Sequence, residues 1–301
     1  MTRGQPHASP PDPDTRRPPP AQDPPLRTAA EWAAHLRWRA LATPRPSLAD
    51  RAREAVGAPI DQLEDLLLGG GRATVADRFV ANGLHVLNEL VQRSRSPERV
   101  VDRYRAQHCA VRSLADVRAL PLADIEAARP PWLAAYDVAA AVSGGLGGFF
   151  GVPGTAFAVP TLFYAALHAV GSHALHFGHD LSDPDEQRFV VDLLAASLVT
   201  RPSTRVEVLR NLEDAAAALE ARNFDAVDTH RVAILEHVAE AVVLRVLLGF
   251  AVRGWPGVGL LLGAGFSRVF VGQVCEAALA TYEQRWLLRR YGDAVRVLSA
   301  R

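Results

Sequence analysis

The chain is 301 residues long, and its 49% of hydrophobic residues can build the core of one large domain or of two small ones. Acidic and basic residues balance at 33 each, whereas a nucleic-acid-binding protein usually carries a basic excess, so we expect no nucleic-acid partner. No lysine is present, which excludes Walker A nucleotide-binding loops and Schiff-base enzymes, because both need one.

The two cysteines, Cys109 and Cys275, lie far apart in the sequence and make neither a disulfide framework nor a thiolate metal site. They fit a reducing, cytoplasmic setting. Residues 1–27 contain nine prolines and almost no large apolar side chain, so they cannot bury enough surface to offset their chain entropy. We predict a disordered Pro-rich tail over 1–27, with a ligand for a proline-binding domain as the alternative, and one folded domain over 28–301.

Helix signals follow one another after the tail. Thr28 and Glu31 have capping-box spacing, which predicts a helix carrying Trp32, Leu36 and Trp38. Similar start and stop signals predict helices that begin at Ser47, at Pro59 and at Ser96-Pro97-Glu98, a helix over 75–91, and two shorter helices punctuated by Pro121 and Pro130.

The segment between Asp137 and Asp180 contains no Asp, Glu, Lys or Arg. It divides into two apolar halves, 131–150 and 160–177, and Gly151-Val-Pro-Gly154 lies between them. Two apolar helices joined by a Gly/Pro turn predict a helical hairpin.

The second half of the chain continues the helical pattern. Gly178 is placed as a C-terminal cap, and Ser182-Asp183-Pro184-Asp185-Glu186 predicts a new helix start. That helix should run to about Val199, and further helices are expected over 203–222, over 226–252 and from Val258 to Tyr291. Because no alternating strand pattern or repeat occurs, we predict an all-α fold, a single multi-helix domain built around the central apolar hairpin.

The order and spacing of several short motifs resemble the EcsC family over about residues 55–293. The motifs are Leu120-Pro-Leu-Ala-Asp124, the small-residue run 139–148, Val152-Pro-Gly-Thr155, Pro160, the stretch 177–184, the stretch 255–259, Gly263-Ala-Gly-Phe-Ser267, Tyr282 and Tyr291-Gly292.

The resemblance implies a membrane-associated accessory protein, because members are often encoded beside an ABC-type exporter, and it implies no catalytic residues. This sequence departs from the family pattern at two places. Gly154-Thr-Ala-Phe157 stands where many members have an acidic residue in the hairpin turn, and Ser267 stands where many have Asn.

Small residues with the spacing of closely packed helices mark the hairpin and the last helix as a membrane or partner contact. The expected contact residues are Gly144, Gly148, Gly151, Pro153, Gly259 and Gly263. A hairpin buried in the protein core is favoured over an arm that inserts into the membrane or lies at its interface, and over a full span, because histidines on the second arm are costly in hydrocarbon.

Four histidines gather near the end of the second arm, and His173, His176 and His179 stand next to Asp180. Three imidazoles and a carboxylate are a sufficient ligand set for zinc or iron, although the spacing matches no zinc signature. Histidines packed on a helix face are the competing and favoured interpretation.

The last helix ends with Arg285 and Arg289 on one face, which could meet anionic headgroups or simply face solvent. The glycines at 145–151 do not fit a dinucleotide fingerprint, and no nucleophile–base pair is evident, so we expect no nucleotide and assign no catalytic residue.

The sequence thus favours a non-catalytic accessory protein, in the cytoplasm and peripheral to or inserted in the inner membrane, whose partner is a membrane surface or a membrane protein. The alternatives are a metal-binding protein or metal-dependent enzyme that uses the histidine cluster, and a carrier of lipid or a small molecule. No cofactor other than that metal is expected, and the oligomeric state stays open.

Overall fold

A computed structural model describes residues 24–43, 91, 96–130, 151–199, 202–223 and 258–298 of the protein. These residues form helices and no strand, which confirms the all-α prediction. The helices are α1 (Ala29–Ala42), α4 (Pro97–Ala106), α5 (Leu114–Val117), α6 (Leu122–Ala127), α8 (Gly151–His176), α9 (Pro184–Leu198), α10 (Pro202–Glu220), α12 (Val258–Tyr291) and the short 3-10 helix η3 (Gly292–Val295).

Several helix starts form where local capping rules place them. The Thr28 side chain accepts from the Glu31 backbone N–H, and the Glu31 carboxylate accepts in return from the backbone of Thr28, so the predicted capping box is confirmed. At α9, the Asp183 side chain accepts from the Asp185 N–H, and Pro184 occupies the first helical position, where a proline costs no hydrogen bond.

The predicted Gly/Pro turn of the hairpin is wrong, because α8 already runs from Gly151 and passes through Pro153 and Pro160 as one helix. Pro153 falls in the first turn of the helix, where the missing N–H needs no partner. Pro160 lies in the helix interior, and the helix continues through it to His176. The predicted first arm at 131–150 lies outside the described residues, as do the predicted helices from Ser47 and Pro59, over 226–252, and, except for Val91, over 75–91.

The end of α8 is fixed by Gly178, as predicted. Its φ of +79° is a left-handed conformation that glycine adopts without strain. The Gly178 N–H donates to the Leu175 carbonyl and the His179 N–H to the Ala174 carbonyl, which is the Schellman arrangement. The chain therefore turns sharply here, and His179 points back toward α12 instead of continuing along the α8 axis.

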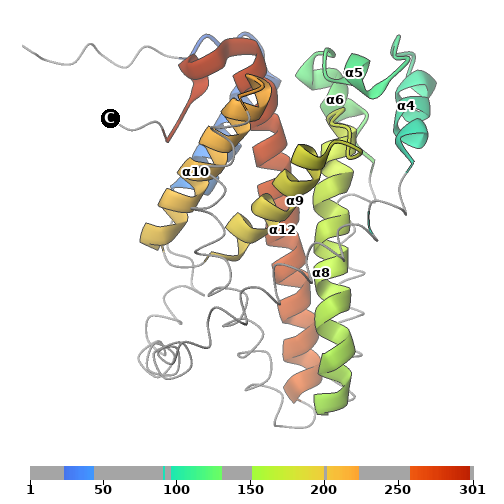
Figure 1. The fold of residues 1–301 in the computed structure, drawn as a ribbon, viewed down its shortest axis with the longest axis vertical. Helices are drawn as coiled ribbons and strands as arrows, with labels where there is room; N and C mark the ends of the chain where they lie inside the picture. Colours follow the sequence, from blue (N-terminus) through green and yellow to red (C-terminus); the bar gives the residue numbers. More distant parts are fainter. Residues whose placement is uncertain are drawn as a thin grey trace, which may run out of the picture.

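α12 is the central helix of the described structure. It runs beside α8 along the long axis of the molecule, and α1, α9 and α10 also pack against it (Figure 1). Its residues from Ala280 to Leu288 are all buried. Every one of its faces is covered in this stretch, so a polar side chain there must find its partner inside the protein.

The segment carrying α4, α5 and α6 covers the end of the molecule where α8 finishes (Figure 1). Tyr104 of α4 donates its hydroxyl to the His176 carbonyl at 2.7 Å, and the His176 Nε2–H donates to the Ile125 carbonyl at 2.9 Å. Trp286 of α12 donates from its indole to the Leu120 carbonyl at 3.1 Å. We call this segment, residues 97–127, the end cap.

No helix within the described ranges combines the length and the apolar character that a bilayer crossing needs.

Candidate functional site

A run of polar residues in the buried part of α12 organises the candidate site. Glu283 pairs with Arg37 of α1, and Gln284 donates to Glu213 of α10. The next residue, Arg285, reaches both α9 and α10. Consecutive residues of a helix point about 100° apart, so one turn of α12 reaches three surrounding helices in succession.

Arg285 is the centre of a buried ionic cluster. Only 1% of it is exposed, and its guanidinium binds the Glu186 carboxylate through two parallel hydrogen bonds of 2.6 and 2.7 Å. The Nε and Nη2 atoms also donate to Glu220 Oε1, at 3.1 and 2.8 Å. A fork-shaped guanidinium suits such bidentate pairing, and the two carboxylates occupy its donors.

Aromatic rings complete the surroundings of Arg285. Its guanidinium carbon lies 4.6 Å from the centre of the Phe189 ring and 5.7 Å from that of Tyr282. Burial by itself would lower the pKa of Arg285, but Glu186 and Glu220 outweigh it and raise the pKa above its ordinary value. The arginine therefore stays charged, and the rings favour that charge through cation–π attraction.

His179 joins this cluster from the α8 end. Its Nδ1–H donates to Glu186 Oε1 at 3.0 Å, because a carboxylate can only accept. Burial, together with the positive charge of Arg285, lowers the pKa of His179, so the imidazole is neutral at pH 7. Burial would raise the pKa of Glu186, but Arg285 and His179 hold it well below its usual value.

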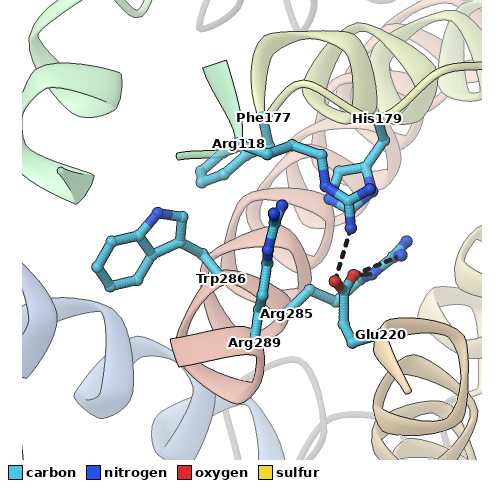
Figure 2. A pocket seen from close by; sticks show the side chains of 7 residues that line it. All are labelled: Arg118, Phe177, His179, Glu220, Arg285, Trp286 and Arg289. Carbon is cyan, nitrogen blue, oxygen red and sulfur yellow. Dashed lines mark hydrogen bonds and ion pairs between the residues drawn. The ribbon is translucent and has the colours of Figure 1, made fainter. Parts of the chain in front are cut away.

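The cluster reaches the surface at a small pocket lined by Arg118, His179, Glu220, Arg285, Arg289, Phe177 and Trp286 (Figure 2). Arg118 comes from the end cap and donates to Glu220 Oε2 at 2.6 Å. Arg289 comes from α12, one turn beyond Arg285, and is exposed. The pocket has about 10 Å³ of free space, which is room for one water-sized group. A lipid or a drug-sized molecule does not fit into it.

Gly178 lets the end cap approach the cluster. A Cβ at this position would lie 2.8 Å from the Arg118 backbone nitrogen and would also collide with the Leu114 carbonyl. A residue without a side chain is therefore needed for both the backbone turn and the contact. The close approach brings Arg118 within reach of Glu220.

A second feature lies on the outer face of α1, which we define as Trp32, Leu36 and Arg39. Trp32 is 38% exposed and Leu36 is 54% exposed, and they are the large hydrophobic residues that stand out at the surface of the described ranges. They are four residues apart and so share one side of the helix. Arg39 is exposed as well, whereas Glu31, the acidic residue of α1, is buried.

Comparison with known proteins decides the family. A model of the EcsC protein family matches residues 47–287, which is most of the chain. This chain belongs to the EcsC protein family. Among curated proteins and among solved structures, nothing matches it. The family resemblance expected from the sequence over about 55–293 is thus confirmed.

In this EcsC protein, the four residues expected as metal ligands have separate surroundings. His176 is bound to the end cap, His179 belongs to the Arg285 cluster, and His173 is buried within α8. Asp180 is exposed and accepts from the Ser182 N–H. Within the described ranges, no three His, Cys, Asp or Glu side chains are gathered so that they could hold a metal ion.

The expected lipid-facing pair on the last helix is separated by the fold. Arg285 faces the core and not a membrane, because Glu186 and Glu220 compensate its charge there, so that prediction needs correction. Arg289 is exposed, as expected.

The small residues expected at a contact are placed only in part. Gly151 and Pro153 lie in the first turn of α8, and Gly259 and Gly263 lie near the start of α12, the helix that packs beside α8. Gly144 and Gly148 lie outside the described residues. Whether these residues contact a membrane or a partner stays a prediction.

Glu220 and Arg118 are the cluster members that sequence reasoning missed. The sequence indicates Glu186 only as an acidic residue in the first turn of a helix. Its pairing with Arg285 spans 99 positions of the chain, and the pairing of Glu220 with Arg285 spans 65. A single sequence carries no local signal for such distant partners.

Proposed function

We propose that this EcsC protein is a non-catalytic accessory protein of the cytoplasm that binds peripherally to the inner membrane, with the outer face of α1 as its contact. The observation that carries the proposal is the exposure of Trp32 and Leu36 on one side of a helix whose exposed charge is Arg39. An apolar and aromatic surface flanked by positive charge suits the boundary between headgroups and acyl chains of an anionic bilayer.

The buried polar groups of the Arg285 cluster form hydrogen bonds with one another, which supports a role without catalysis. The carboxylates of Glu186 and Glu220 are each bound by Arg285, and the Nδ1 of His179 is bound to Glu186. With the Nδ1–H of His179 donating to Glu186, the free lone pair of this imidazole lies on Nε2, and a pocket with room for one water-sized group leaves a substrate little space to reach it. The expected link to an ABC-type exporter follows from the family resemblance and agrees with such a role.

Flotation with liposomes tests the proposal. The wild-type protein should float with vesicles of phosphatidylcholine and phosphatidylglycerol, float poorly with phosphatidylcholine alone, and be released by salt, because screening weakens the attraction. The double variant W32A/L36A should bind about tenfold more weakly or worse, since it removes two apolar side chains from the contact.

Two controls make the flotation result specific. R39Q should weaken binding less than the double variant, whereas R188Q, which removes an equal charge from the exposed side of α9, should leave it unchanged. Urea unfolding of W32A/L36A should match that of the wild type. The proposal fails if the wild type never floats, or if W32A/L36A floats as well as the wild type. Resistance to carbonate would mean insertion and would also contradict a peripheral contact.

A further inference from the structure

The mouth of the Arg285 cluster carries a positive charge that no carboxylate among the described residues compensates by an ion pair. Three guanidinium groups, from Arg118, Arg285 and Arg289, surround the carboxylates of Glu186 and Glu220. His179 is neutral, so one positive charge remains without a carboxylate. An anion would compensate this surplus.

Arg289 is the cation that is left over. No carboxylate in the described ranges lies within ion-pair distance of it, whereas Arg118 is paired with Glu220 and Arg285 with both glutamates. Partial burial and the positive charge of Arg118 lower the pKa of Arg289 more than the negative charge of Glu220 raises it. Two guanidinium groups that repel each other at the edge of a pocket favour an anion between them.

The shape of the mouth indicates which anion would fit. Arg118 enters from the end cap and Arg289 from α12, so their donors approach from different elements (Figure 2). A phosphate group has oxygens that project in several directions, and arginine pairs of this kind are favoured phosphate ligands. The pocket admits one oxygen-sized group, so one phosphate oxygen would enter while the others stay at the rim.

We propose that Arg118 and Arg289 bind the phosphate group of a ligand at the mouth of the Arg285 cluster. Arg118 would keep its bond to Glu220 and use other N–H donors for the phosphate, since a guanidinium has five. The source of the phosphate is either a soluble compound or a lipid headgroup. In the second case the site would deepen the proposed membrane role, and that case rests on the proposed function.

Titration calorimetry with inorganic phosphate, at low salt in a buffer without phosphate, tests the soluble source. R289Q is the main variant, because Arg289 is exposed and its replacement should not disturb folding. It should bind phosphate about tenfold more weakly or worse, as expected for loss of a charged hydrogen bond. R118Q should show a similar loss, and R188Q, with the same change in net charge, should bind as the wild type does.

Flotation tests the lipid source. Vesicles of phosphatidylcholine with phosphatidic acid are compared with vesicles given equal negative charge by oleate, which carries a carboxylate and no phosphate. Recruitment that prefers phosphatidic acid and is lost in R289Q supports a lipid headgroup as ligand. If R289Q matches the wild type in both experiments, or if R188Q loses as much as R289Q, the site is overturned.

The two proposals fail in different ways. A wild-type protein that binds inorganic phosphate through Arg289 but never floats keeps the phosphate site and loses the membrane contact. A protein that floats through Trp32 and Leu36, with R289Q unimpaired in both experiments, keeps the membrane contact and loses the phosphate site.

Discussion

Two buried clusters meet α12 at neighbouring residues, and they differ in how their carboxylates are satisfied. At Gln284, the Glu213 carboxylate accepts from the Trp38 indole, from the Gln284 amide and from the backbone N–H groups of Val297 and Leu298. At Arg285, the carboxylates face guanidinium groups, and the cluster opens to a pocket.

The difference separates a structural contact from a candidate binding site. The first cluster, which we call the Glu213 cluster, connects α1, α10 and the segment after η3 to the central helix. Its donors are neutral groups, and all of them donate hydrogen bonds to the Glu213 carboxylate. The Arg285 cluster also ties helices together, but it has more cations than carboxylates and one of those cations is exposed. An excess of guanidinium groups over carboxylates, with one guanidinium exposed, is what an anion from solution can bind.

The largest effect should come from removing the centre of the Arg285 cluster. R285A leaves the carboxylates of Glu186 and Glu220 buried without their cation, and should lower the free energy of unfolding by about 3–5 kcal/mol. Urea unfolding followed by circular dichroism measures this. R289A should cost less than about 0.5 kcal/mol, as is usual for an exposed side chain.

A compensated variant sharpens this result. R285M/E186Q/E220Q removes all three charges and should be more stable than R285A, because no uncompensated charge remains inside. Equal instability of the two would mean that packing around Arg285, and not its charge, holds the cluster together.

Disrupting the Glu213 cluster should lower the free energy of unfolding somewhat less than R285A does. E213A leaves four donors without their acceptor and should cost about 2–4 kcal/mol. Hydrogen exchange should quicken most at the amides of Val297 and Leu298, whose acceptor is gone. Phosphate binding at Arg289 should not change, and a loss there would show that the two clusters are coupled.

Replacing Gly178 should loosen the end cap. G178A puts a Cβ against backbone atoms of Leu114 and Arg118 and forces alanine into a left-handed conformation, with an expected cost of about 2–3 kcal/mol. The Arg118–Glu220 pair should open, because the end cap must move away. Thermal unfolding measures the cost. An unchanged melting temperature would contradict the close contact.

The smallest effect expected is a pH dependence that runs in opposite directions in two places. Burial, aided by the nearby Glu126, raises the pKa of Glu283 to about 7 even though Arg37 opposes the shift. The folded state then holds a proton that the unfolded state releases above pH 4.5, so stability falls as the pH rises from about 4.5 to 7. E283Q should flatten this slope.

The Arg285 cluster should contribute a pH dependence of stability with the opposite sign. The pKa values of Glu186 and Glu220 are lowered in the folded protein, so their stabilisation is present above pH 4.5 and is lost as the pH falls below it. Unfolding curves recorded across both windows test the two signs. A slope below pH 4.5 that survives in R285M/E186Q/E220Q would have to come from other groups.

Local rules in the sequence predict much of the helix layout. The capping box at Thr28, the Asp183-Pro184 start and the Gly178 cap depend on neighbours within five residues, and each was predictable for that reason. The bounds of α12 follow from breakers and apolar spacing. Pro160 misled the prediction, because a proline usually breaks or begins a helix and α8 instead continues through it.

The interior of the candidate site could not be predicted in the same way. Arg285 and Arg289 sit one turn apart and look alike in the sequence, yet one is buried and the other exposed. Their fates depend on Glu186 and Glu220, which come from other helices. An arginine on a helix therefore does not always mark the side that faces solvent. It can be buried where carboxylates from other helices pair with it, as Glu186 and Glu220 do with Arg285.

The position of α12 in the chain has a consequence for synthesis on the ribosome. Arg37, Glu186, Glu213 and Glu220 are all made before residues 283–285, with which they pair. Until α12 emerges, Glu186 lacks the guanidinium that compensates its charge, and Arg37 and Glu220 can form only part of their ion pairs, so the earlier helices gain less by packing. We therefore expect the nascent chain to stay loosely packed and open to chaperones until this helix arrives, and then to fold in one cooperative step.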